Sequence, residues 1–220
     1  MNFEPLFSCP VFSSITAEKR PAFLERLDYS VKTFKKNERI ANQGERIEYL
    51  YVLLQGRAKA EMISNAGTVL RIETIQAPDT LASAFLFAKP NCFPVDVTAM
   101  ELCSVMLITK QSLVRQLSEN EMFLQAYMEM NARRTIFLSD KLRLLTLRTI
   151  KGRLSIYILQ HSKGLDFTLD MNQTQLAEFF CVSRPSLARS LSQMIADGVI
   201  EISKGKGKIL NPNALKDLII

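Results

Sequence analysis

Residues 172–210 read NQTQLAEFFCVSRPSLARSLSQMIADGVIEISKGKGKIL, and this stretch decides the fold of the C-terminal part of the chain. Asn172 is followed three residues later by Gln175, which is the pattern of a capping box. The pattern predicts a short helix that begins there and runs through Phe180, with Leu176 and Phe180 on one apolar face.

A second helix is predicted almost at once. Ser183 can cap it, Pro185 suits its first turn because an N–H is not needed there, and Gly198 suits the position after its end. Its predicted buried face consists of Leu187, Leu191, Met194 and Ile195. Two short helices joined by about three residues are typical of a helix-turn-helix.

The residues around these helices are suited to nucleic acid. Arginine reads guanine bidentately, whereas Ser and Gln contact phosphates or base edges. Two apolar segments, 199–202 and 208–210, flank the basic turn Lys204–Gly207, which predicts a hairpin wing. A solvated surface is the alternative for each feature alone, but their joint placement favours DNA. The predicted DNA-contacting residues are Gln173, Ser183, Arg184, Ser186, Arg189, Gln193, Lys204, Lys206 and Lys208.

The charge distribution supports this interpretation. The chain has 28 Lys and Arg against 22 Asp and Glu, a net charge of +6. Residues 1–132 hold 14 basic and 15 acidic groups, a balance of −1, and residues 133–220 hold 14 and 7, a balance of +7. A basic terminal region on a neutral body is the expected footprint of binding to the phosphate backbone.

The first half of the chain shows the pattern of an antiparallel β domain. Between Val31 and Thr109, short apolar segments alternate with turn signals at spacings of about 8 to 12 residues. The apolar run Tyr49–Leu54 predicts a buried strand, and Asn65–Gly67 predicts the turn of a hairpin. The pattern favours a roll, barrel or sandwich.

Residues 119–147 are predicted to form a long helix. One set of positions along it recurs at alternating spacings of four and three, as in a coiled-coil seam. This seam consists of Leu124, Met128, Asn131, Thr135, Leu138, Leu142 and Leu145. A neighbouring stripe consists of Phe123, Tyr127, Met130, Phe137 and Leu144. The seam favours a homodimer; the alternative is a helix packed on its own β domain, and both interpretations can hold because there are two surfaces to cover.

Composition excludes several other classes of protein. The chain has 220 residues, 47% of them hydrophobic, which excludes disorder, and no apolar run approaches the roughly 18 to 20 residues that a membrane helix needs. The N-terminus lacks the features of a secretory signal, so we expect a cytosolic protein with free cysteines. A single histidine, His161, argues against most metalloenzyme chemistry, and we expect neither a metal site nor an enzyme.

The whole chain resembles the Crp/Fnr family of bacterial transcription regulators. Residues 34–44 (FKKNERIANQG) and 51–56 (YVLLQG) are similar to the opening of the family's β roll, and residues 176–202 to its DNA-binding signature. The resemblance implies a homodimer on a palindromic operator in double-stranded DNA, with RNA polymerase as a partner. It implies an α+β fold with an N-terminal cyclic-nucleotide-binding-like β-roll sensor domain (1–118), a dimerisation helix (119–147) and a C-terminal winged helix-turn-helix (148–220).

The sequence departs from the two best-known effector types of this family. Members that bind cyclic nucleotides hold the ribose with a Gly-Glu pair and the cyclic phosphate with an Arg-Ser or Arg-Thr pair. The corresponding stretches here, 81–87 (LASAFLF) and 93–95 (FPV), contain neither the acid nor the arginine. A phosphate buried without a cation is strongly disfavoured, so cAMP is not expected. An iron–sulfur cluster is not expected either, because only Cys9 stands near the N-terminus.

Residues 81–99 resemble instead the HcpR-like regulators of nitrosative stress, some of which sense nitric oxide through haem. Because His161 lies in the DNA-binding half, a haem here would need methionine or cysteine ligands. The expected effector pocket consists of Leu81, Ala82, Ser83, Phe85, Phe87, Phe93, Pro94 and Leu138. Haem is the one cofactor that the sequence leaves open.

Two alternatives from other classes remain. Cys92 and Cys103 lie on neighbouring segments of the predicted sensor and would form a thiol redox switch, although only Lys89 places a positive charge near them and inert buried thiols are favoured. A cupin-like barrel enzyme is disfavoured, because the sequence has no histidine cluster, GxSxG or HExxH motif.

Overall fold

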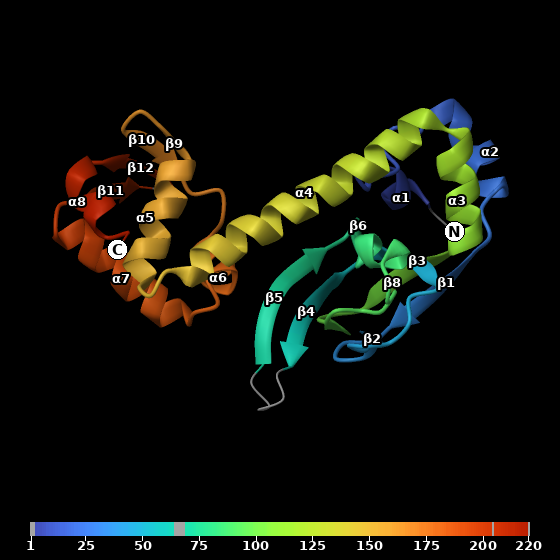
Figure 1. The fold of residues 1–220 in the computed structure, drawn as a ribbon, viewed down its shortest axis with the longest axis horizontal. Coiled ribbons are helices and arrows are strands. Elements are labelled where there is room, and N and C mark those ends of the chain that lie inside the picture. The colour runs from blue at the N-terminus through green and yellow to red at the C-terminus, as the bar shows by residue number, and fades with distance from the viewer. Residues whose placement is uncertain (1–2, 64–68, 204, 220) are drawn as a thin grey trace. The chain divides into compact units, whose positions relative to one another are not determined.

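The computed structural model describes residues 3–63, 69–203 and 205–219. The chain forms two compact units, residues 1–135 and 136–220. The border falls inside the long helix α4 (Glu121–Thr146), which begins in the first unit and ends in the second (Figure 1). Each unit therefore includes part of this helix, whereas the sequence analysis treats residues 119–147 as a segment of their own.

The first unit is built around two antiparallel four-stranded sheets. One has the strand order β1-β8-β3-β6 and the other β2-β7-β4-β5. The strands are β1 (Tyr29–Phe34), β2 (Arg39–Ala41), β3 (Tyr49–Gln55), β4 (Arg57–Ile63), β5 (Val69–Gln76), β6 (Asp79–Leu81), β7 (Asp96–Ala99) and β8 (Cys103–Thr109). Helices α1 (Glu4–Ser8), η1 (Ala17–Lys19), α2 (Arg20–Glu25), η2 (Ser83–Phe87) and α3 (Lys110–Glu119) complete the unit before α4.

The β patterns of the sequence correspond to these strands. The predicted buried strand Tyr49–Leu54 is confirmed as β3, because residues 50–54 are all buried between neighbouring strands. Strands β4 and β5 pair along their whole length and form the predicted hairpin (Figure 1). The predicted turn Asn65–Gly67 lies outside the described residues.

The first part of α4 packs on this unit with one of its two apolar stripes. Phe123, Tyr127 and Met130 are each at most 6% exposed and belong to the same hydrophobic core as the strands. Phe123 meets the rings of Phe12 and Phe23 from the N-terminal helical segment. The predicted packing of the helix on its own β domain is therefore confirmed for these three residues.

The second unit is a small mixed domain with its own core. After α4 come α5 (Ile150–Gln160), β9 (Ser162–Lys163), β10 (Asp166–Thr168), α6 (Gln173–Phe179), α7 (Arg184–Ala196), β11 (Ile200–Ser203), β12 (Lys206–Ile209) and α8 (Pro212–Asp217). The four strands form one antiparallel sheet in the order β11-β12-β10-β9. Phe137 and Leu144 of α4 pack in this unit and not on the β roll, which corrects the sequence analysis.

Candidate nucleic-acid interface

Helix α6 begins at the predicted capping box. The Asn172 side-chain oxygen accepts the backbone N–H groups of Thr174 and Gln175 at 3.0 Å each, and the Gln175 side chain accepts the Asn172 N–H at 2.9 Å. Leu176 and Phe180 are completely buried, as predicted. Because these interactions are local, the helix starts at the residue that the sequence indicates.

The turn between α6 and α7 contains a cysteine in an unusual backbone conformation. Cys181 has φ = +56°, in the left-handed region that favours glycine. Its N–H donates to the Glu178 carbonyl, and the N–H of Val182 donates to the Ala177 carbonyl. The turn is thus closed by backbone hydrogen bonds around a strained residue.

Replacing Cys181 by glycine is expected to raise the free energy of unfolding by about 0.5–1 kcal/mol. The left-handed conformation costs an L-residue roughly 1–2 kcal/mol, which exceeds the roughly 0.5–1 kcal/mol that glycine loses in chain entropy. Urea denaturation followed by circular dichroism measures the difference. Cys181→Ala is the control, because it keeps the Cβ atom and should give no stabilisation; equal stabilities of the two variants would contradict the strain.

Helix α7 presents a polar face outside the core. Ser183 caps its first turn by accepting the Ser186 N–H, and Gly198, with φ = +67°, follows its end. Leu187, Leu191 and Met194 are buried as predicted. Ile195 was predicted to be buried but is 43% exposed, because it lies at the edge of the apolar stripe, where the chain turns away at Gly198 and buries Val199 instead.

The predicted DNA-contacting side chains of the helix-turn-helix lie at the start of α6, for Gln173, and on this face of α7 and at its leading end for the others. Gln173, Ser183, Arg184, Arg189 and Gln193 are exposed, and Ser186 is half-buried. Ser183 Oγ also lies 2.8 Å from Ser186 Oγ, so these hydroxyls are used within the helix start. Within the described part of the chain, Arg184 and Arg189 have no hydrogen bond or ion pair, which leaves both guanidinium groups available to an external acceptor.

The predicted wing is a hairpin of β11 and β12. Ile200 pairs with Ile209, and both are buried, while Lys206 and Lys208 of β12 are exposed. A Cβ atom on Gly207 would lie 2.3 Å from the Phe167 ring, so only glycine allows β12 to approach β10 this closely. The predicted contact Lys204 lies outside the described residues.

Alanine at Lys206 or Lys208 is expected to weaken binding to every DNA sequence. If each ammonium neutralises one phosphate, each substitution lowers the slope of log affinity against log salt by about 1. The effect of Lys208 should be the smaller one, because Glu201 lies opposite it on β11. Titrations at several salt concentrations measure the slope. Lys216→Ala, on α8 away from the wing, is the control; an unchanged slope in both wing variants would contradict the contact.

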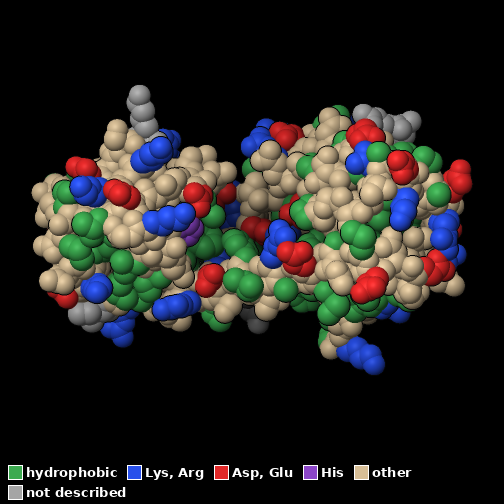
Figure 2. All heavy atoms as spheres, turned by 90° about the horizontal axis from the view of Figure 1, so that it is seen from above, with side chains coloured by type: hydrophobic (Ala, Val, Ile, Leu, Met, Phe, Trp, Pro, Cys, Tyr) green, Lys and Arg blue, Asp and Glu red, His purple; other side chains and the backbone are tan. Residues whose placement is uncertain are grey.

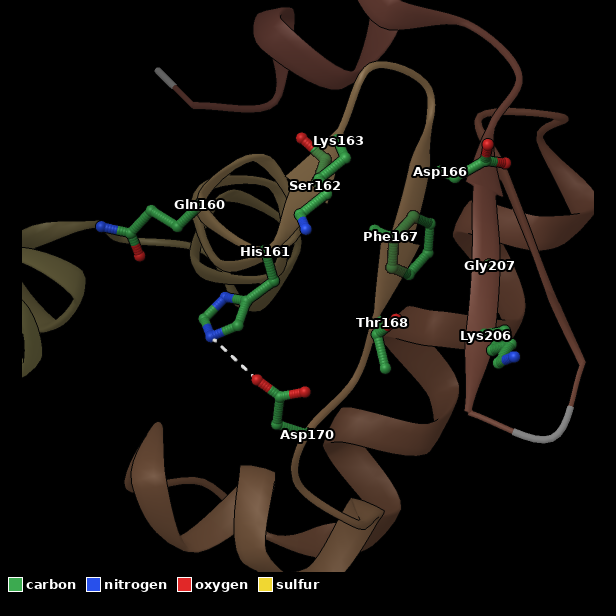
Figure 3. Close-up of a pocket in the computed structure, with 10 residues that line it drawn as sticks. All are labelled: Gln160, His161, Ser162, Lys163, Asp166, Phe167, Thr168, Asp170, Lys206 and Gly207. Atoms are coloured by element: carbon green, nitrogen blue, oxygen red, sulfur yellow. Dashed lines mark ion pairs between the residues drawn. The ribbon is translucent and has the colours of Figure 1, made fainter.

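A hollow of about 590 Å³ lies beside the wing, between the end of α5, strands β9 and β10, and β12. His161 lies at the end of α5 and points toward Asp170, with 3.6 Å between His161 Nε2 and the carboxylate (Figure 3). His161 also stacks on Tyr157, with ring centroids 4.0 Å apart, and is the single purple side chain in Figure 2. No sequence motif predicts this contact, because Asp170 lies nine positions away across two strands.

The residues of the predicted effector pocket lie around β6, η2 and the segment before β7. Leu81, Ser83 and Phe93 are buried, Ala82, Phe85 and Pro94 are half-buried, and Phe87 is 42% exposed. Ala82 has φ = +49°, in the left-handed region that favours glycine. Leu138 belongs to the second unit.

Polar contacts hold η2 against α4. Ser83 Oγ donates to Asn131 Oδ1 at 3.0 Å, and the Tyr127 hydroxyl donates to the Ser83 carbonyl at 2.8 Å. Burial raises the pKa of Tyr127 to about 12, so it stays a donor. Arg134 donates to Glu73 at 2.7 Å and to the Thr80 carbonyl at 3.1 Å.

The two cysteines of the thiol hypothesis lie at opposite ends of β3. Cys103 Sγ donates to the Arg57 carbonyl, just after β3 ends, whereas Cys92 bridges Arg46, just before β3 begins. The seven residues of β3 span roughly 20 Å, whereas Cα atoms in a disulfide are about 4–7 Å apart. Burial also raises the pKa of Cys103. The fold therefore argues against a disulfide between them.

The predicted seam of α4 stands mostly in solvent. Met128 is 63% and Leu142 67% exposed, and Leu124, Thr135 and Leu138 are also exposed, while Leu145 is half-buried. Asn131 differs from the rest, because both ends of its amide are bonded within the first unit, to Ser83 and to the Tyr127 carbonyl. An apolar stripe of this kind on one helix needs a partner surface.

The fold and these sites define a class of protein. A β roll of the cyclic-nucleotide-binding type precedes a helix-turn-helix with a wing. The second helix of this motif, α7, carries exposed arginines and has the form that enters a major groove of DNA. Among the described residues, no helix is long and apolar enough to cross a membrane, and no group of side chains is arranged to hold a metal ion. The class is that of DNA-binding transcription regulators.

Comparison with known proteins agrees. Residues 31–120 match the cyclic nucleotide-binding domain, and residues 152–218 match the Crp-like helix-turn-helix domain. A transcriptional regulator from Thermotoga maritima of known structure is 31% identical over 53% of this chain and 91% of its own, with a TM-score of 0.50. The chain belongs to the Crp/Fnr family of transcription regulators.

Two further relatives cover nearly the whole chain. The probable transcriptional regulator flp of Lacticaseibacillus casei is 26% identical over 213 residues, 94% of each protein. The structure of CprK in complex with OCPA has a TM-score of 0.67 at 16% identity and covers 93% of this chain and 94% of its own. The first of these relatives is named as a transcriptional regulator, and the second shares the fold of this chain.

Proposed function

We propose that the protein acts as a cytoplasmic homodimer that binds a palindromic operator and controls transcription through RNA polymerase. The observation that carries the proposal is the polar face of α7, where Arg184 and Arg189 are exposed and have no partner in the described chain. The exposed seam of α4 supports the dimer. Two copies joined along it would present two α7 helices to half-sites about one helical turn apart.

The effector in this proposal is not a cyclic nucleotide. Ser83 lies in the stretch 81–87 that corresponds to the family's ribose-binding Gly-Glu stretch, and its hydroxyl is already bonded to Asn131. Phe93 lies in the stretch 93–95 that corresponds to the family's phosphate-binding stretch. It is 1% exposed and meets the Tyr51 ring edge-on, with the ring centroids 5.1 Å apart. An anionic phosphate at this place would lose its hydration against two aromatic rings without gaining a cation.

The contact between η2 and α4 is the route by which an effector would act. A ligand that hydrogen-bonds the Ser83 hydroxyl must displace Asn131 from it, and the Tyr127 hydroxyl bonds the Ser83 carbonyl next to it; both residues lie on α4. Such a displacement would shift the population of α4 arrangements, and with it the spacing of the two α7 helices in the dimer. In this proposal the effector is a ligand of the β-roll pocket other than a cyclic nucleotide.

Haem, in the HcpR-like manner, is the second candidate, and in the β roll its ligand would have to be a methionine or a cysteine. His161 lies in the second unit, stacked on Tyr157. Burial raises the pKa of Cys9 to about 12 and also raises that of Cys103, which disfavours both as ligands, whereas Cys92 is half-buried. Met130 Sδ accepts the Thr80 hydroxyl at 3.2 Å inside the core.

Selection of DNA from a random-sequence pool tests the proposed function. The purified protein should enrich a two-fold-symmetric site, and light scattering should give the mass of a dimer on one such duplex. Enrichment of asymmetric sequences, or a single copy of the chain bound per duplex, would overturn the dimeric regulator.

Millimolar cAMP is expected to leave the affinity for this operator unchanged, because the β roll offers the phosphate no cation. Fluorescence anisotropy with labelled operator measures the effect, with AMP as a control for non-specific anions. A selective gain in affinity with cAMP would contradict the proposal.

Titration with haem and then nitric oxide tests the second candidate. A complex with a shifted Soret band that changes operator affinity would support haem as the effector.

A further inference from the structure

Arg153, on α5, joins the ends of two other helices in the second unit. Its Nε and Nη2 atoms donate to the Leu147 carbonyl at 3.1 and 3.0 Å, and its Nη1 atom donates to the Phe180 carbonyl at 2.7 Å. The side chain is half-buried. All three hydrogen bonds end on backbone, so they depend on where the helices end and not on the identity of a partner side chain.

Both acceptors lie at helix C-termini. Leu147 directly follows α4, which ends at Thr146, and Phe180 directly follows α6, which ends at Phe179. The last carbonyls of a helix lack partners within it and carry the negative end of its dipole. In the described part of the chain Arg153 has no carboxylate partner. Its positive charge is therefore balanced by the carbonyl groups at these two helix ends.

The Phe180 carbonyl is also the first group of the helix-turn-helix turn. The next residue is Cys181 in its left-handed conformation, and two residues later Ser183 caps α7. The direction in which α7 leaves the turn is therefore set beside the carbonyl that Arg153 holds. A change of this hydrogen bond would be transmitted to α7 over three residues.

Aromatic packing places α4 against the same end of α6. The ring centroids of Phe137 on α4 and Phe179 on α6 are 5.6 Å apart, and Lys141 Nζ lies 5.6 Å from the Phe179 ring centroid. This packing keeps the two helices in contact. The three directed hydrogen bonds of Arg153 add a fixed geometry to it, because each requires a particular position of its backbone acceptor.

We propose that Arg153 is a positioning residue for DNA binding, which holds the helix-turn-helix turn at a fixed place relative to the end of α4. The inference rests on the proposed operator binding and adds a residue outside the DNA-contacting face. Because its nitrogens are used within the chain, Arg153 acts through α7 and not by touching DNA.

Arg153→Lys is the variant that tests this role. Lysine keeps the positive charge but has one ammonium in place of the planar fork, so it cannot hold both carbonyls in the same geometry. Operator affinity should fall about tenfold, the loss of one charge-assisted hydrogen bond, while affinity for unrelated DNA changes less than about twofold. Arg148→Lys is the matched control, an exposed arginine five residues earlier with no partner in the described chain.

The measurements are made well below the unfolding midpoint of each variant, found by circular dichroism. A fall in the ratio of operator to non-specific affinity in folded Arg153→Lys, absent in Arg148→Lys, supports positioning. An unchanged ratio in the folded variant overturns it, as does a variant that does not fold at any temperature, because the role would then be structural. Failure of the wild type to select an operator would overturn the proposed function instead.

Discussion

Leu142→Glu is expected to convert the dimer into monomers and to lower affinity for a palindromic operator by at least about 100-fold. Leu142 is 67% exposed in the single chain, so the glutamate is harmless to the folded monomer. In a seam between two copies of α4 it would place two carboxylates in an apolar contact, where an unpaired charge is strongly disfavoured. A monomer also loses the gain from binding two linked half-sites, which is about 10²- to 10⁴-fold.

Ile136→Glu is the matched control for this experiment. Ile136 is 62% exposed on the same helix but lies about 120° around the helix axis from Leu142, outside the seam. It should leave both the mass measured by sedimentation equilibrium and the operator affinity unchanged. A dimer that survives Leu142→Glu with full affinity would show that α4 is not the interface.

Arg184→Ala should reduce operator affinity about 10- to 100-fold and relax the preference for one base pair in each half-site. A bidentate arginine–guanine contact contributes about 1–3 kcal/mol of discrimination, and alanine cannot replace it. The guanidinium has no partner within the described chain, so its removal should not lower the stability of the second unit. Competition between the operator and single-base variants of it measures the lost discrimination.

The loss of one positive charge must be separated from the loss of a base contact. Arg148→Ala removes the same charge from an exposed position of the same unit and should weaken binding to all sequences alike, if at all. If Arg184→Ala keeps the wild-type order of preference among operator variants, the assignment of α7 as the recognition helix is wrong.

Local signals account for the success of sequence reasoning in the second unit. The capping box at Asn172 and the cap at Ser183 involve residues two or three positions apart, so the sequence alone fixes where α6 and α7 begin. The prediction that Ile195 is buried was wrong for a tertiary reason. Ile195 lies at the edge of the apolar stripe of α7, and Val199 covers that part of the core instead.

Contacts between distant segments were beyond the reach of the sequence pattern. Asn131 fits the period of the seam, yet its amide is bonded to Ser83, 48 positions away. Cys92 and Cys103 are close in sequence, but the strand order places the length of β3 between them. No sequence motif predicts the role of Arg153. Its acceptors are backbone carbonyls, and these come within reach of one side chain only through the packing of three helices.

The sequence by itself determined the family, the helix-turn-helix with its wing and the strand-rich character of the first half. It also showed that the cyclic-nucleotide motif is absent. Each of these properties depends on residue types at short spacing in the chain. Only the tertiary structure decided that Ser83 and Phe93 are already occupied by contacts within the chain, that Cys181 is strained and that Arg153 links two helix ends. Those properties arise from the packing of elements far apart in the chain, which hydrophobic period and capping signals do not encode.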